Sequence, residues 1–459
     1  MLQIWGIAPD ATSSGGSRLA EEACEARHDQ TIVHGSLLEV IGLSRCGFLA
    51  LPCAGFRQTA VIAGSFARVW QSRMQVLMAA GSTRSWLCRS GAGLCLSLWF
   101  LFGGARAIRA DPEMDAHVRE IVTENLAPLT TADHPGGVAA AVYVAGRIQF
   151  FNFGFADEAE KRPVTSDTLF NVASVRKLFE ATLLALGELR GELSLDDPVN
   201  KYIPELRGDY IRRVTLGQLA AHTSGLLLPT DHPPWPNASY SLAELIDILN
   251  AWTPHAGEAP GKQRIYTHAG YVLLQLALER RYGVPIRQLV ESRILTPLGM
   301  HSTLMPERGR DNRAIMPPEQ LRKAVQGYSD QGTPIGAPGN QQSYFDFPGT
   351  GQMFSTARDL ATFMAACIDG NVADPQLREA LRMTQREAFH IDQQFGQAMA
   401  WENIALNGID VVDKPGGLNN ASAYVGLVPA RRIGLLLLAN RGEFSHEIGR
   451  YHILPALAR

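Results

Sequence analysis

Residues 171–179 read Asn171-Val172-Ala173-Ser174-Val175-Arg176-Lys177-Leu178-Phe179, and this stretch decides how the rest of the chain is interpreted. Residues three apart on a helix share a face, so the amine of Lys177 is expected beside the hydroxyl of Ser174. The residues that follow are largely apolar, and burial lowers the pKa of a lysine amine. A free amine can take the proton of a serine, which is otherwise a poor nucleophile. The stretch predicts an activated serine at the start of a buried helix, and Ser174 can also cap that helix.

The order of the other segments predicts the fold class. Strands are expected near both ends of the chain, and a long, mostly helical region separates them. Terminal strands most simply join one antiparallel sheet, and the helical region then forms a second lobe. We therefore predict an α/β fold of the α+β type, with a sheet lobe at about 110–170 and 350–459 and a helical lobe at about 171–349. The expected strands are 137–145, 148–155, 409–414, 423–428 and 433–440.

Composition limits the function classes. The chain has 459 residues, a formal net charge of −3 and 46% hydrophobic residues, which is the balance of an ordinary globular protein. It has no basic excess, so no nucleic-acid partner is expected. Five of the six cysteines precede residue 100 and leave Cys367 alone in the folded body. A single cysteine forms no internal disulfide, so cysteine usage does not report the redox compartment.

The first hundred residues have the pattern of a targeting segment rather than of a domain. Basic residues at 84–89 precede an apolar run at 91–102, and Ala105-Arg106-Ala107 fits a small-x-small cleavage site. The apolar run is shorter than the roughly 20 residues that span a membrane. We predict a secretory signal within 74–107, cleaved after Ala107, with Ala110 as a second candidate for the cleavage site and a retained anchor as the alternative. Residues 1–73 are interpreted as an upstream extension that forms no domain, and residues 108–459 as the catalytic domain of a secreted or periplasmic protein.

Two further motifs supply partners for the serine. Tyr266 stands just before a predicted helix at 268–282, in the run Tyr266-Thr267-His268. Lys414 ends a predicted strand and is followed by Pro415-Gly416-Gly417, where glycine lets the backbone approach a ligand. A serine hydrolase needs a nucleophile, a proton shuttle and a site for the oxyanion. Ser174 could supply the first, and Lys177 or Tyr266 the second. The amides of Ser174 and Gly417 could supply the third.

At this point the chain resembles the serine β-lactamases and penicillin-binding proteins. Their marks are Ser-x-x-Lys, then Tyr-x-Asn, then Lys-Thr/Ser-Gly, in that order. The spacing of Ser174, Tyr266 and Lys414 is most similar to the class C β-lactamases and their esterase and DD-peptidase relatives. Three other stretches carry the same resemblance, which extends over about residues 112–459: Leu219–Leu226, Phe354–Ala361 and the hairpin Ala423–Arg441.

The resemblance implies roles for the matched residues. Ser174 would be acylated by the substrate, and Lys177 and Tyr266 would exchange the proton, with the choice of base left open. Lys414 would lower the pKa of the tyrosine and attract a substrate carboxylate. The oxyanion would lie between the Ser174 and Gly417 amides.

Two matched positions depart from the family pattern. His268 stands where the family has asparagine, and an imidazole there can make one hydrogen bond to substrate and titrate near neutral pH. The alternative is that His268 only caps the following helix. Pro415 stands where the family has threonine or serine. That change removes a hydroxyl expected to bind the substrate carboxylate, together with one backbone amide.

The chain lacks the sequence motifs of other hydrolase classes. It has no His-x-His-x-Asp or His-Glu-x-x-His, so no metal is expected, and no cofactor is implied. It has no Gly-x-Ser-x-Gly elbow. We predict a monomeric serine hydrolase that acts on a small β-lactam through an acyl-enzyme. One alternative is an esterase or DD-peptidase that acts on an ester or peptidoglycan-like substrate, which Pro415 favours. The other is a penicillin- or peptidoglycan-binding module without turnover.

Overall fold

The computed structural model describes residues 112–131, 134–226, 241–254, 257–308, 314–340, 353–442 and 445–459. The predicted upstream extension and the predicted signal sequence fall outside these ranges. No helix within them is long and apolar enough to cross a membrane.

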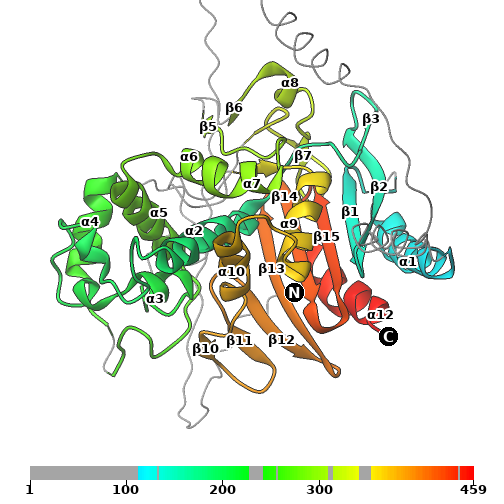
Figure 1. Cartoon of the computed structure of the whole chain (residues 1–459). Coiled ribbons are helices and arrows are strands. Elements are labelled where there is room, and N and C mark those ends of the chain that lie inside the picture. Colours follow the sequence, from blue (N-terminus) through cyan, green and yellow to red (C-terminus); the bar gives the residue numbers. More distant parts are fainter. Residues whose placement is uncertain are drawn as a thin grey trace, which may run out of the picture. The chain divides into compact units, whose positions relative to one another are not determined.

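An antiparallel sheet of nine strands, in the order β10-β11-β12-β13-β14-β15-β1-β2-β3, forms the centre of the described chain (Figure 1). It joins strands from both ends of the sequence, because β1 pairs with β15 along Val138–Val144. The predicted sheet of N- and C-terminal strands is thereby confirmed. The bounds of its strands are β1 Gly137–Val144, β2 Arg147–Asp157, β3 Arg162–Pro163, β10 Phe389–His390, β11 Phe395–Gln397, β12 Glu402–Leu406, β13 Ile409–Leu418, β14 Ala421–Val428 and β15 Ile433–Ala439.

Strand β1 shows why the sheet is covered on both faces. Its residues are almost all apolar and buried, and alternate side chains of a strand point to opposite faces. Ala139, Ala141 and Tyr143 belong to one hydrophobic core, and the intervening residues belong to another. Helices α2 and α9 contribute to the first core, and α1 and α12 to the second. A near-continuous apolar run therefore marks a strand buried from both sides.

The predicted helix at 268–282 and the predicted buried helix after Ser174 are both present. The bounds of the α-helices are α1 Pro112–Leu126, α2 Lys177–Leu189, α3 Leu216–Ala220, α4 Leu242–Ala251, α5 His268–Tyr282, α6 Ile286–Val290, α7 Thr296–Leu298, α8 Pro318–Leu321, α9 Ala357–Asp369, α10 Pro375–Met383, α11 Ser445–Glu447 and α12 Leu454–Leu457. Shorter turns are η1 Ala127–Leu129, η2 Ala173–Arg176, η3 Val199–Lys201, η4 Ile211–Arg213 and η7 Pro429–Arg431, with π-helical turns η6 Glu291–Leu295 and η8 Ile448–Ile453. The remaining strand pairs are β4 Phe170–Asn171 with β9 Phe354–Ser355, β5 Glu307–Arg308 with β6 Ala314–Ile315, and β7 Gly327–Tyr328 with β8 Pro334–Ile335.

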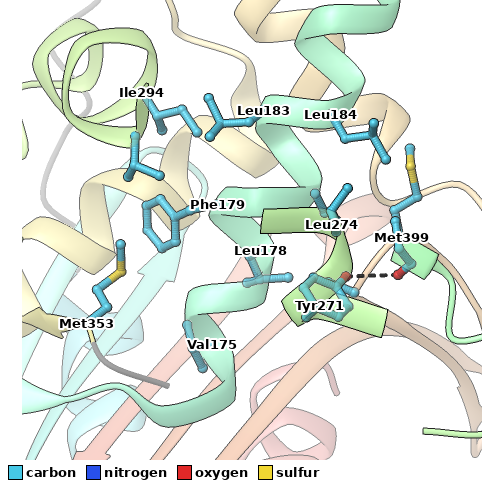
Figure 2. Packing of buried hydrophobic residues seen from close by; sticks show 14 of the residues in the cluster. Val175, Leu178, Phe179, Leu183, Leu184, Tyr271, Leu274, Ile294, Met353 and Met399 are labelled. Atoms are coloured by element: carbon cyan, nitrogen blue, oxygen red, sulfur yellow. Dashed lines mark hydrogen bonds between the residues drawn. The ribbon is translucent and has the colours of Figure 1, made fainter. Parts of the chain in front are cut away.

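Helix α2 is buried along most of its length, as its apolar sequence predicts. Figure 2 shows Val175, Leu178 and Phe179 surrounded by side chains from several other segments. The Phe179 ring stacks on Phe363 of α9 with centroids 4.6 Å apart. A fully buried side chain of this kind contributes about 1.5–3 kcal/mol to stability. The helix that begins at the predicted catalytic lysine is thus fixed by packing.

Candidate active site

Ser174 lies on a tight turn rather than at a helix cap. It belongs to η2, and α2 begins only at Lys177, whose preceding residue Arg176 makes no side-chain cap. The prediction that Ser174 caps the helix is therefore wrong, because a 3₁₀ turn intervenes. Ala173 has a positive φ of 46°, a region that residues other than glycine rarely adopt, and its N–H donates to Asn171 Oδ1 at 3.0 Å. Such strain is common where a turn presents a reactive side chain.

Lys177 is fully buried and contacts the serine. Its Nζ donates a hydrogen bond to Ser174 Oγ at 3.0 Å. Burial lowers the pKa of the Lys177 amine, and the positive charge of Lys414 lowers it further. Removal of an ammonium group from water disfavours its charged form. The structure thus gives Lys177 the environment that the apolar sequence around it indicates, and its amine can hold or accept the proton of Ser174.

Tyr266 approaches the serine from another segment of the chain. Its hydroxyl donates to Ser174 Oγ at 2.9 Å. Burial alone would raise the pKa of this phenol, but Lys177 and Lys414 outweigh burial and lower the pKa to about 8. Two candidate proton acceptors therefore contact one hydroxyl, and each has a lowered pKa. The geometry brings both to Ser174 and leaves the choice between them open.

Backbone contacts fix Tyr266 just before α5. Thr267 is the N-cap of that helix, and its Oγ1 accepts from the Ala269 N–H at 3.2 Å. The alternative that His268 serves as the cap is therefore wrong. On the other side of Tyr266, the Ile265 N–H donates to the His222 carbonyl at 2.8 Å. His268 is the first residue of α5, and its ring meets Tyr266 edge-on with centroids 5.7 Å apart.

Lys414 reaches the site from strand β13. Its side chain is buried, and Nζ lies 4.8 Å from the centre of the Tyr266 ring. Gly416 is two residues further on the same face of the strand. A Cβ atom at Gly416 would lie 2.9 Å from the Ser174 nitrogen, so only glycine lets the strand pass this close to the turn. The predicted set Ser174, Lys177, Tyr266 and Lys414 is thus brought together.

Pro415 also reveals the direction of the Gly417 amide. Strand β13 pairs with β14 as far as Leu418, but its pairing with β12 ends at Asp413. Among the described residues, one edge of β13 is therefore open beyond Asp413. Proline has no N–H and fits a strand only where its nitrogen faces such an edge. Residues two apart in an antiparallel ladder direct their N–H groups the same way. The Gly417 N–H therefore points to the open edge, and it is available to a substrate oxygen.

A buried network behind Lys414 was not foreseen from the sequence. Arg450 donates from Nε and Nη2 to both oxygens of Asp413, each at 2.7 Å, and from Nη2 to Glu402 at 2.6 Å. Arg264 donates to the other Glu402 oxygen at 3.1 Å. Asp413 precedes Lys414, so this network holds the strand that carries the lysine. Its members lie far apart in the sequence, so no local spacing could have predicted it.

His222 is a further residue of the site that the sequence did not predict. Its ring is fully buried, and its centroid lies 4.3 Å from that of Tyr266. Neither ring nitrogen has a hydrogen-bond partner among the described residues. Burial lowers the pKa of the imidazole well below its usual value, and Lys414 and Arg264 add to that effect. A neutral ring therefore packs against Tyr266. The described residues contain no group of three or more His, Cys, Asp or Glu side chains placed to hold a metal ion.

A family model for β-lactamases matches residues 115–458, which is most of the chain. The chain belongs to the β-lactamase family. Among named relatives, the β-lactamase of Pseudomonas fluorescens is 28% identical over 356 residues, which cover 71% of this chain and 94% of the relative. The β-lactamase of Escherichia coli K12 is 26% identical over 358 residues, with 71% and 89% covered.

Solved structures agree with this family assignment. A class C β-lactamase matches with a TM-score of 0.62 and 25% identity, over 77% of this chain and 98% of the other. A D-alanine carboxypeptidase AmpC from Burkholderia cenocepacia also matches with a TM-score of 0.62, at 28% identity over 74% and 99%. The predicted β-lactamase/DD-peptidase-like fold and the resemblance to class C enzymes are thereby confirmed. This protein is a hydrolase of the serine β-lactamase type.

Proposed function

We propose that this protein hydrolyses the amide bond of a β-lactam through an acyl-enzyme formed on Ser174. The observation that carries the proposal is the pair of contacts on Ser174 Oγ, 3.0 Å from Lys177 Nζ and 2.9 Å from the Tyr266 hydroxyl. Such contacts join a nucleophile to a general base. Relatives from several bacteria carry the name β-lactamase, which supports the same activity.

The reaction follows from the roles proposed for these groups. Ser174 Oγ attacks the carbonyl carbon of the lactam, and its proton passes to Lys177 or Tyr266. The tetrahedral oxyanion lies between the amides of Ser174 and Gly417. The carbon–nitrogen bond then breaks, and the ring nitrogen takes the proton. Water attacks the acyl ester, gives its proton to the same base and releases the product acid together with free Ser174.

A second candidate function is the hydrolysis of an ester or of a D-alanyl peptide on the same site. The observation that favours it is Pro415, which offers neither the side-chain hydroxyl nor the amide of the usual threonine to a substrate carboxylate. His268 changes a second position near Tyr266. One structural relative is named a D-alanine carboxypeptidase, which supports this candidate. Each of these substrates would use the same groups around Ser174.

Three assays distinguish these functions. The wild-type protein and Ser174→Ala are incubated with nitrocefin, p-nitrophenyl acetate and a peptide that ends in D-Ala-D-Ala, and each reaction is followed by intact mass. Rapid nitrocefin turnover by the wild type alone supports the lactamase. Turnover of the ester or the peptide without nitrocefin turnover supports the second candidate. A lasting adduct without turnover of any substrate supports a binding module and contradicts both hydrolytic functions.

We propose further that the protein is exported and loses its N-terminal segment after Ala107. The support is the basic, apolar and small-x-small pattern of residues 84–107. N-terminal sequencing of the protein recovered from a bacterial periplasm is expected to begin at Ile108. A periplasmic product that retains residues 84–107 would contradict cleavage, and a product found only in the cytoplasm would contradict export.

A further inference from the structure

A buried ion pair lies directly behind the serine turn. Arg176 stands between Ser174 and Lys177 in the sequence, and its Nε donates to Glu180 Oε1 at 2.7 Å. The side chains of Arg176 and Glu180 are only 4% and 0% exposed. The burial of two charged side chains needs an explanation, because removing each charge from water costs several kcal/mol.

The arginine also joins the serine turn to the helix that follows Tyr266. Its Nη2 donates to Gln275 Oε1 on α5 at 2.5 Å. The Gln275 amide in turn donates to Glu279 at 3.1 Å. The second oxygen of Glu180, by contrast, has no hydrogen-bond partner among the described residues. Arg176 is therefore the main group that balances the Glu180 carboxylate.

The Glu180 carboxylate also acts on Lys177, the catalytic candidate at the start of α2. Glu180 is three residues after Lys177, so the two share a helix face. Glu180 raises the pKa of Lys177 against the larger lowering by burial, and it also interacts with Tyr271, whose ring centre is 5.5 Å from Lys177 Nζ. The other titratable or charged groups that face this cluster are Tyr266, His222, Lys414, Arg264, His268 and Glu279.

Burial raises the pKa of the Glu180 carboxyl, and Arg176 is the first of the groups that lower it again. At any pH that leaves this carboxyl ionised, its negative charge would hinder either choice of base if Arg176 were absent. It would raise the pKa of the Lys177 amine and leave less of its free form. A negative charge nearby also raises the pKa of a phenol, so Tyr266 would hold less phenolate. The pairing with Arg176 removes most of this effect.

We propose that Arg176 is a positioning residue that pairs the buried carboxylate of Glu180 and thereby shields Ser174, Lys177 and Tyr266 from its negative charge. The proposal concerns the activation of Ser174 and is the same for lactam, ester and peptide substrates. It also explains how an arginine and a glutamate stand in an otherwise apolar helix start: each is tolerated because the other is present.

The test compares Arg176→Met, Glu180→Gln and the double variant with the wild type. A fluorophosphonate probe reports the activation of Ser174 without a chosen substrate: Ser174 Oγ bonds to phosphorus, fluoride leaves and the base takes the proton. The rate of labelling is measured by intact mass between pH 5 and 10. We expect Arg176→Met to react about tenfold more slowly at pH 7, with its pH midpoint raised by about one unit. Glu180→Gln and the double variant should stay within about threefold of the wild type, since neither leaves an unpaired carboxylate.

A double variant as slow as Arg176→Met, or an Arg176→Met variant with the wild-type pH profile, would overturn the proposal. Two controls separate charge from tethering. Arg176→Lys keeps the positive charge and should keep the wild-type midpoint. Gln275→Met removes the tether to α5 and should also leave the midpoint in place. If Arg176→Met fails to fold, the double variant decides alone: it must fold and label at the wild-type midpoint. Because labelling is independent of substrate, a failed nitrocefin assay does not affect this test.

Discussion

The two sides of the site each bring a buried lysine to Tyr266, but they hold it in different ways. On the helix side, Lys177 follows Ser174 by one helical turn, and the ion pair of Arg176 and Glu180 lies behind it. On the strand side, Lys414 comes from the distant strand β13, behind which Arg450 binds Asp413 and Glu402. The helix side matches the family pattern at Ser174 and Lys177, whereas the strand side carries the departure at Pro415.

This difference separates the two tasks of the site. In the proposed mechanism the helix side supplies the nucleophile and one candidate base, so it would decide whether acyl transfer occurs. In the same mechanism the strand side supplies the open edge and the Gly417 amide, and it would face the rest of the substrate. Changes on the helix side are therefore expected to affect every substrate alike, and changes on the strand side to affect some substrates more than others.

The largest effect is expected for Lys177→Met. The amine that contacts Ser174 is lost while a buried side chain of similar length remains, and general base catalysis contributes about 10²–10⁴-fold. We expect kcat/KM to fall by about 10³-fold for nitrocefin and for p-nitrophenyl acetate alike. Steady-state assays on both substrates check this. A loss confined to one substrate would contradict the proposed division of tasks between the helix side and the strand side.

Arg450→Met tests the network on the strand side. Its removal leaves the buried carboxylates of Asp413 and Glu402 without their main partner, although Arg264 still contacts Glu402. Loss of one partner from a buried ion pair costs about 3–5 kcal/mol of stability. Urea unfolding of the variant and the wild type measures this difference. A loss below about 1 kcal/mol, the level of an exposed pair, would show that the network does not stabilise β13.

Lys414→Met is expected to shift the pH profile as well as the rate. Lys414 is one of the two lysines that lower the pKa of Tyr266 to about 8. Without it that pKa rises by about one unit, so less phenolate is present at neutral pH. The rising limb of kcat/KM should move to higher pH by the same amount, with a loss of about tenfold at pH 7. An unchanged limb would show that Tyr266 is not the group that titrates.

Pro415→Thr has an expected effect no larger than that of Lys414→Met, and it has the clearest dependence on substrate. A restored hydroxyl offers a hydrogen bond to a substrate carboxylate, which is worth about 1.5 kcal/mol or roughly tenfold. We expect nitrocefin turnover to rise by about that factor, with p-nitrophenyl acetate, which has no carboxylate, unchanged. An equal change for both substrates would mean that the substitution acts through the backbone of β13.

Local spacing explains what the sequence could predict. Ser174 and Lys177 are neighbours on one turn, and the strands at both ends are apolar enough to be recognised. The shorter strands β10, β11 and β12 and the helices α10 and α12 were not foreseen. Strands of two to five residues carry too little alternation to predict, and their place follows from pairing with β13.

Long-range contacts explain what the sequence left open. The packing of His222 on Tyr266 and the pairing of Arg450 with Asp413 join segments whose distance in space no local pattern reports. The pair of Arg176 and Glu180 is different, because two opposite charges four residues apart in an apolar helix are visible in the sequence. The positive φ of Ala173 could not be predicted from the sequence, since alanine has no preference for a positive φ.

Peptide mass spectrometry during nitrocefin hydrolysis tests the central claim most directly. Wild-type protein is mixed with nitrocefin, quenched in acid within seconds and digested, and the same is done with Ser174→Ala. The account predicts a transient adduct of nitrocefin mass on the peptide that carries Ser174, turnover by the wild type, and neither adduct nor turnover with Ser174→Ala. Turnover by Ser174→Ala, or an adduct on another residue, would contradict the claim that Ser174 is the nucleophile.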